Sequence, residues 1–88
     1  MTITFTTHAL TVILERGLSP DQVKRVLASP DWLEPDATQS DVTLAFGRLL
    51  EKGGRVLRVA YVEQDGSRRV LTAFLDRTRR HGPKGSGP

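Results

Sequence analysis

Histidine and arginine are the residue types in this sequence that could act on a phosphate group. His8 stands at the start of residues 7–17, a segment typical of a helix. The partial positive charge of a helix N-terminus disfavours imidazolium, so His8 is a candidate neutral base or hydrogen-bonding group. The alternative is a histidine that caps the helix or packs between helix and strand. Helical spacing places it beside Thr11 and Glu15, opposite the apolar residues, which predicts an exposed side chain.

Most cations lie in the second half of the chain. Residues 1–47 carry three basic and six acidic side chains, a net charge of −3. Residues 48–88 carry ten basic and four acidic side chains, a net charge of +6, and the two halves sum to +3. This asymmetry predicts a C-terminal surface that attracts phosphates or an acidic protein. The alternative is a set of arginines on solvated strand faces that bind no partner.

Arg58 interrupts an otherwise apolar segment, residues 56–62, so it must face a cleft, pair with an acid or lie on an open face. Metal-free RNA cleavage needs cations that hold the phosphate and a group that takes a proton from the ribose 2′-OH. Arg58 and Arg55 could supply the first and His8 the second. The competing interpretation is a surface salt bridge of small energetic value. Its candidate acids are Glu15, Glu63 and Asp76.

Further arginines extend the predicted nucleic-acid-binding set beyond the catalytic pair of His8 and Arg58. The full set is Arg16, Arg55, Arg68, Arg69, Arg77, Arg79 and Arg80. Its C-terminal members could bind phosphates with salt-sensitive affinity, or could simply solubilise a tail. The chain has no cysteine, which excludes disulfides and thiolate zinc sites. The acidic residues between 31 and 41 match no ligand spacing, so neither a metal nor a cofactor is expected.

The residues that must position these side chains are typical of alternating strands and amphipathic helices. Residues 2–6 alternate as in a half-buried strand, and Thr7 is the expected cap of the first helix. The apolar stripe expected on that helix consists of Ala9, Leu10, Ile13 and Leu14. Ser19-Pro20-Asp21 predicts the start of a second helix, which Ser29-Pro30 ends.

The second half of the chain predicts strands joined by hairpins. Strands are expected over residues 42–50, 56–62 and 68–75, and the middle one is apolar on both faces, as in a central strand. Glycines in the segments 51–54 and 64–67 indicate the two hairpin turns. A further short strand around Trp32 is left open.

This order predicts an α+β fold, β-α-α-β-β-β, with two N-terminal helices packed on an antiparallel sheet. Residues 1–81 are expected to form a single domain and residues 82–88 a flexible tail rich in glycine and proline. No apolar run is long enough to span a bilayer, and the N-terminus lacks the basic region of a signal peptide. These features favour a cytoplasmic protein without a membrane partner.

Several short motifs, in this order and spacing, resemble a known family. They are Phe5-Thr6-Thr7-His8-Ala9, Glu15-Arg16-Gly17-Leu18-Ser19, Val26-Leu27, Pro30-Asp31-Trp32-Leu33-Glu34-Pro35-Asp36, Gly54-Arg55-Val56-Leu57-Arg58-Val59 and Val70-Leu71-Thr72-Ala73-Phe74. The sequence is similar to the bacterial domain-of-unknown-function family numbered 4258, which is allied to RelE/ParE-type toxins.

The resemblance implies a RelE/ParE-like fold and a metal-free endoribonuclease in a toxin–antitoxin setting. RNA or the ribosome would be the target and an antitoxin protein the partner. One position departs from the expected pattern, since Val12 stands where the family is expected to carry an arginine four residues after the histidine. The alternative is therefore a non-catalytic module of the same fold that binds nucleic acid or protein.

Overall fold

Two helices and five strands make up an α+β chain in the computed structural model, which describes residues 2–76. The elements in order are β1 (Thr2–Phe5), α1 (Thr7–Glu15), α2 (Pro20–Ala28), β2 (Trp32–Pro35), β3 (Val42–Leu49), the 3-10 turn η1 (Leu50–Lys52), β4 (Arg55–Gln64) and β5 (Ser67–Asp76). The α+β class expected from the sequence is confirmed. The predicted tail, residues 82–88, and the last residues of the predicted domain lie outside the described range.

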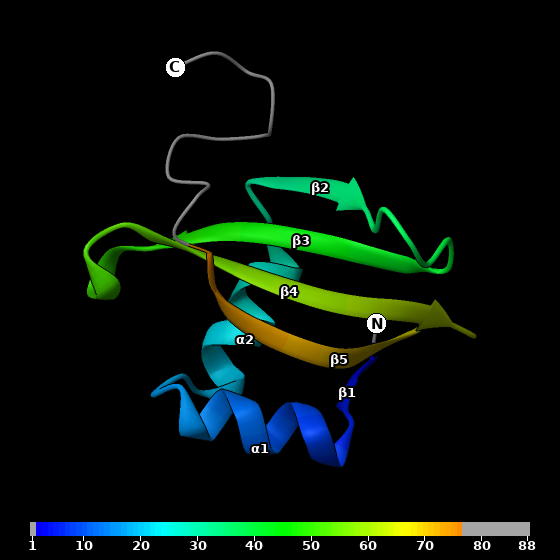
Figure 1. Cartoon of the computed structure of the whole chain (residues 1–88), viewed down its shortest axis with the longest axis horizontal. Helices are drawn as coiled ribbons and strands as arrows, with labels where there is room; N and C mark the ends of the chain where they lie inside the picture. Colours follow the sequence, from blue (N-terminus) through cyan, green and yellow to red (C-terminus); the bar gives the residue numbers. More distant parts are fainter. Residues whose placement is uncertain (1, 77–88) are drawn as a thin grey trace.

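The strands form one sheet in the order β1-β5-β4-β3-β2, so β4 is central as predicted (Figure 1). Neighbouring strands are antiparallel except at one edge, where β1 runs parallel to β5 and Phe5 pairs with Val70. The expectation of an antiparallel sheet is therefore wrong, because the sheet is mixed. A parallel pair needs a long crossover, which here comprises everything between the first and last strands. The short strand around Trp32 forms as β2 at the opposite edge.

Both helices begin at side-chain caps. The Thr6 hydroxyl accepts a hydrogen bond from the Ala9 N–H, so α1 starts one residue before the position expected from the sequence. Ser19 caps α2 as predicted, in a reciprocal capping box with Gln22. These caps hold the chain in helical geometry immediately after β1 and again after the turn at Gly17, whose φ is +70°.

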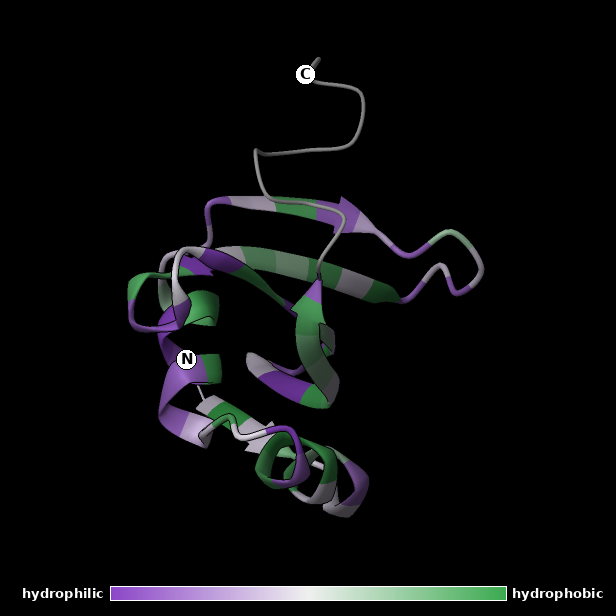
Figure 2. Ribbon diagram, turned by 60° about the vertical axis from the view of Figure 1, so that its left-hand side comes forward, coloured by the Kyte–Doolittle hydropathy of each residue, from purple (hydrophilic) through white to green (hydrophobic). Residues whose placement is uncertain are grey.

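The core lies between the sheet and the helices, on the face of the sheet that we call the helix side. Figure 2 shows the hydrophobic residues of α2 turned toward the sheet and its hydrophilic residues turned outward. Val23, Val26 and Leu27 of this helix are buried against the sheet. Gly47 permits the close approach, because a Cβ atom there would lie 3.0 Å from Val26 Cγ2.

The buried face of α1 differs from the predicted stripe. Ala9, Val12 and Ile13 are buried, whereas Leu10 and Leu14 are 39% and 65% exposed. The expectation that both leucines face the core is therefore wrong. Because α1 lies beside β5 and β1 rather than across the middle of the sheet (Figure 1), its contact face is narrow and shifted toward Val12.

The other side of the sheet, which we call the open face, carries its own apolar cluster. Its buried members are Val42, Leu44, Phe46, Val56 and Ala60. Three of them, Val42, Leu44 and Phe46, alternate along β3, as residues on one face of a strand do. Trp32 of β2 stacks on Phe46, with ring centroids 4.9 Å apart and planes 6° from parallel.

Candidate functional site

A row of aligned side chains crosses the open face of the sheet. Trp32 pairs with Phe46, Phe46 pairs with Arg58, and Arg58 pairs with Phe74. Directly opposed residues of antiparallel strands project to the same side. The row therefore spans four adjacent strands, and a single arginine on the central strand stands between aromatic residues.

The Arg58 side chain is held by a ring and a carboxylate, but its guanidinium makes no hydrogen bond within residues 2–76. Its guanidinium carbon lies 5.1 Å from the centroid of the Phe74 ring. Its Nη1 lies 3.7 Å from Oδ2 of Asp76, an ion pair longer than a hydrogen bond. The Arg58 side chain is 29% exposed. A half-buried guanidinium has five N–H donors, and no acceptor among residues 2–76 takes a hydrogen bond from this one, so it is suited to an incoming anion.

A second guanidinium reaches the same ring from α1. Nη1 of Arg16 donates a hydrogen bond of 2.8 Å to the Ala73 carbonyl, and its guanidinium carbon lies 5.7 Å from the Phe74 centroid. Since both distances end on one centroid, 5.1 Å for Arg58 and 5.7 Å for Arg16, the two guanidinium carbons are at most 10.8 Å apart. Phe74 therefore brings two cations from distant parts of the chain together.

Negative side chains moderate this positive site. Asp76 is 6% exposed and pairs with Arg58, so it is one of the three acids that the salt-bridge interpretation anticipated. An incoming anion must compete with it for the guanidinium. Hydrogen bonds from the Thr38 N–H, the Thr38 hydroxyl and the Gln39 N–H lower the pKa of Asp36, and the charge of Arg58 lowers it further. The field of Arg58 thus reaches the loop after β2.

The two neighbouring arginines of β5 lie away from this site. Arg68 is on the helix side, where its Nη1 donates to the Leu27 carbonyl at 2.7 Å and its Nε lies 3.5 Å from a Glu63 carboxylate oxygen. Its guanidinium also covers the Tyr61 ring. Arg69 is exposed on β5, five residues before Phe74, which is about 17 Å along a strand. The structure therefore does not gather all the predicted phosphate contacts around Arg58.

His8 is exposed, as its helical position predicts, but it lies at the far end of α1 from Arg16. The two are eight positions apart, about 12 Å along the helix axis. Val12 lies between them and is 8% exposed, packed toward the core. The structure therefore brings Arg16 to Arg58 through Phe74 and leaves His8 at the other end of the helix.

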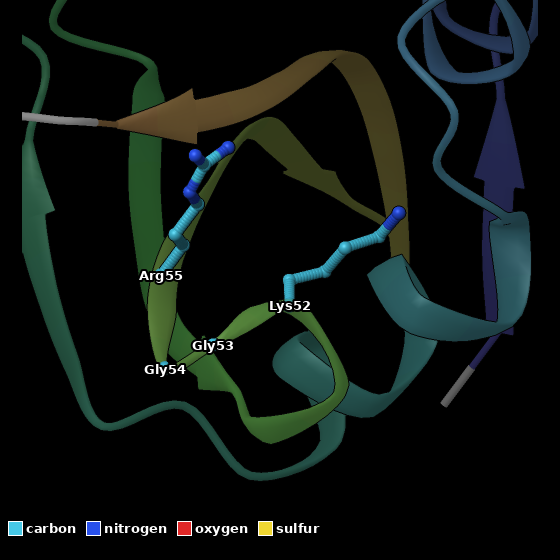
Figure 3. A pocket seen from close by; sticks show the side chains of 4 residues that line it. All are labelled: Lys52, Gly53, Gly54 and Arg55. Atoms are coloured by element: carbon cyan, nitrogen blue, oxygen red, sulfur yellow. The ribbon is translucent and has the colours of Figure 1, made fainter.

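Arg55, the first residue of β4, is exposed beside the β3–β4 hairpin. It lines a cavity of about 490 Å³ together with Lys52, Gly53 and Gly54 (Figure 3). Sequence reasoning missed Lys52 and the role of Phe74. Alternation in the sequence predicts that Val70, Thr72 and Phe74 share one face of their strand, and this prediction is wrong for Val70. A register shift between Ala60 and Tyr61 places Val70 opposite Tyr61 in the helix-side core, whereas Phe74 lies opposite Arg58 on the open face. Arg77, Arg79 and Arg80 of the predicted set lie outside the described residues.

Two kinds of feature are absent from residues 2–76. No three histidine, cysteine or acidic side chains gather there in a way that could hold a metal ion. No helix in that range is long and apolar enough to cross a membrane. The arrangement offers instead two guanidiniums on one ring, which is chemistry for binding an anion.

The sequence model of one family matches residues 5–75 of the chain. The family is described as "Domain of unknown function (DUF4258)", and the chain belongs to it. The membership expected from the sequence motifs is confirmed. No curated protein and no solved structure was found to match.

Proposed function

We propose that this protein binds RNA through Arg58 and Arg16 on the open face of its sheet. The observation that carries the proposal is the state of Arg58. Its side chain is half-buried and lies against Phe74, and its guanidinium makes no hydrogen bond within residues 2–76. A guanidinium positioned in this way loses little conformational entropy when it binds a phosphate, and it can do so with two parallel hydrogen bonds.

Three features favour RNA as the source of the phosphate. Arg16 supplies a second cation within reach of an adjacent phosphate. Half-exposed Trp32 and Phe74 lie in the same row, and proteins commonly combine such rings with arginines to bind unpaired RNA. The similarity to RelE/ParE-type toxins, an expectation from the motifs, also points to RNA and to a toxin–antitoxin setting with an antitoxin partner.

Metal-free cleavage is the activity that the same similarity implies. Cleavage needs a proton acceptor close to the phosphate held by Arg58. His8 is about 12 Å along α1 from Arg16, so it is poorly placed for that role. We therefore propose the non-catalytic form of the function, in which the domain binds RNA without cutting it.

Fluorescence anisotropy with a labelled single-stranded RNA tests the binding directly. We expect Arg58→Gln to weaken binding about tenfold or more, because hydrogen bonds to charged groups contribute about 1.5–3 kcal/mol each. The matched control is Lys24→Gln, which removes one positive charge from an exposed position on α2 and should leave the affinity close to wild type. Absence of RNA binding, or equal affinities for the two variants, would contradict the proposal.

Electrophoresis of the same labelled RNA after incubation tests the non-catalytic form. The RNA should remain at full length with the wild-type protein. Shortened products that disappear with His8→Ala would show that the domain cleaves RNA after all. In that case induced expression should also arrest bacterial growth, and His8→Ala should relieve the arrest.

A further inference from the structure

A further cation, Lys52, lies close to Arg16 and contacts the residue that follows it. Gly17 follows Arg16 in the turn between the two helices, and its carbonyl accepts a hydrogen bond of 3.2 Å from Lys52 Nζ. Lys52 belongs to the β3–β4 hairpin, more than thirty residues further along the chain. This contact connects the Arg58–Phe74–Arg16 site to the hairpin and its cavity.

The hairpin cavity has the chemistry of an anion site. Of the described residues, Lys52, Gly53, Gly54 and Arg55 line it, and none of these four is acidic. Figure 3 shows the Lys52 and Arg55 side chains extending from the hairpin in the same general direction. Both glycines have φ between +69° and +77°, so this tight turn favours residues without a side chain and its wall is largely backbone. At about 490 Å³ the cavity is large enough for a nucleotide.

The cations of the cavity retain hydrogen-bonding capacity. The Arg55 side chain is exposed and makes no hydrogen bond or ion pair within residues 2–76. Lys52 has three N–H donors and uses one on Gly17. The acid next to Lys52, Glu51, is engaged elsewhere, because it accepts hydrogen bonds from Gln22 and Arg25 of α2.

We infer that Arg58, Arg16, Lys52 and Arg55 form one basic track for successive phosphates of a single-stranded RNA. In this arrangement the hairpin cavity binds a nucleotide beyond the one held at Arg58. The inference rests on the proposed RNA-binding function and adds to it a second subsite and a preference for unpaired strands.

The shape of the basic track supports the preference for unpaired RNA. Arg55 and Arg58 are three residues apart on β4, so alternation turns their side chains to opposite sides of the sheet. Arg16 bridges the two sides at the edge of β5, where it bonds to Ala73 and covers Phe74. A ligand on all four cations must therefore bend around this edge. A flexible single strand can do so, whereas a duplex stays nearly straight over such a short distance.

Salt-dependent binding measurements test the basic track with Arg55→Gln and Lys52→Gln. For a long single-stranded oligonucleotide we expect each variant to bind severalfold more weakly. The logarithmic salt slope should fall in magnitude by about 0.7 for each phosphate contact removed. A duplex of the same length and charge per strand should bind more weakly than the single strand, and Lys24→Gln serves as the charge control.

The outcomes separate the inference from the proposed function. If Arg58→Gln weakens binding but Arg55→Gln and Lys52→Gln retain wild-type affinity and slope, the basic track is wrong while the proposed function stands. Equal affinity for duplex and single strand would also overturn the basic track. If the wild-type protein binds no RNA, both the basic track and the proposed function are wrong. Urea unfolding of each variant checks that the fold is intact, and Arg55→Gln is the cleaner change because it breaks no described contact.

Discussion

Arg58 and Arg68 lie on adjacent strands, but their side chains are on opposite faces of the sheet and make different contacts. Arg68 is on the helix side, where it donates to the Leu27 carbonyl at the end of α2 and pairs with Glu63. Arg58 is on the open face, where it touches Phe74 and Asp76 without a hydrogen bond. Their side chains are similarly exposed, 22% for Arg68 and 29% for Arg58. Burial alone therefore does not distinguish a structural arginine from a binding one.

The use of their donors does distinguish them. A guanidinium that satisfies an otherwise open helix carbonyl contributes to folding and has less to offer a ligand. A guanidinium that rests on a ring with its N–H groups unfilled can hydrogen-bond an anion at little cost. The comparison assigns stability to the helix side and ligand binding to the open face, and each part of it can be tested.

The largest effect should come from the core on the helix side. Ile13→Ala removes a fully buried side chain of α1 and should lower the free energy of unfolding by about 2–5 kcal/mol, measured by urea denaturation. Leu14→Ala is the control, because Leu14 is 65% exposed and its truncation should change stability little. Equal losses for the two variants would show that the described orientation of α1 is wrong.

The next effect concerns Arg68. Arg68→Gln removes the donor to the Leu27 carbonyl and should lower the free energy of unfolding by about 1–3 kcal/mol. Its neighbour Arg69 is exposed, so Arg69→Gln should leave stability close to wild type. A stable Arg68→Gln protein with impaired RNA binding would reverse the roles of the two faces.

A smaller effect is expected from the ring that the two binding arginines share. Phe74→Leu keeps an apolar side chain but removes both cation–π contacts, each of about 0.5–1 kcal/mol. RNA affinity should fall a few fold. If the ring acts by positioning Arg58, the double variant with Arg58→Gln should bind no more weakly than Arg58→Gln alone. Additive losses would mean that Phe74 contacts RNA independently.

The smallest effect is electrostatic and lies near the hairpin. A hydrogen bond from its own backbone N–H, followed by those from Gln22 and Arg25, lowers the pKa of the Glu51 carboxyl. A group with a lowered folded-state pKa stabilises the fold above its ordinary pKa and loses that contribution as the pH falls through the folded value. Glu51→Gln should therefore be slightly less stable than wild type at neutral pH. The difference should vanish in acid, as urea unfolding across pH would show.

Local sequence signals predicted much of the fold. Ser19-Pro20 located the start of α2, and the doubly apolar segment 56–62 identified the central strand. The parallel pairing of β1 with β5 could not be predicted, because it joins the two ends of the described chain. The buried face of α1 was ambiguous for another reason. Five of the six residues from Ala9 to Leu14 are apolar, so their pattern does not define a single stripe.

The candidate site was only partly predictable for similar reasons. A lone arginine in an otherwise apolar strand is unusual, so the sequence by itself singles out Arg58. Its meeting with Arg16 depends on α1 lying along the edge of β5, and that placement is tertiary. The same holds for Lys52, whose connection to Arg16 runs through the turn at Gly17.

The most direct test of the central claim measures stability and RNA affinity together for Arg58→Gln and Arg68→Gln. Urea unfolding and RNA anisotropy on the same preparations give both quantities. The account predicts that Arg58→Gln loses about tenfold or more in RNA affinity, whatever stability it loses with the ion pair to buried Asp76. It predicts that Arg68→Gln loses stability while its folded form keeps wild-type affinity. The opposite pattern, or equal effects of both variants on RNA affinity, would contradict the account.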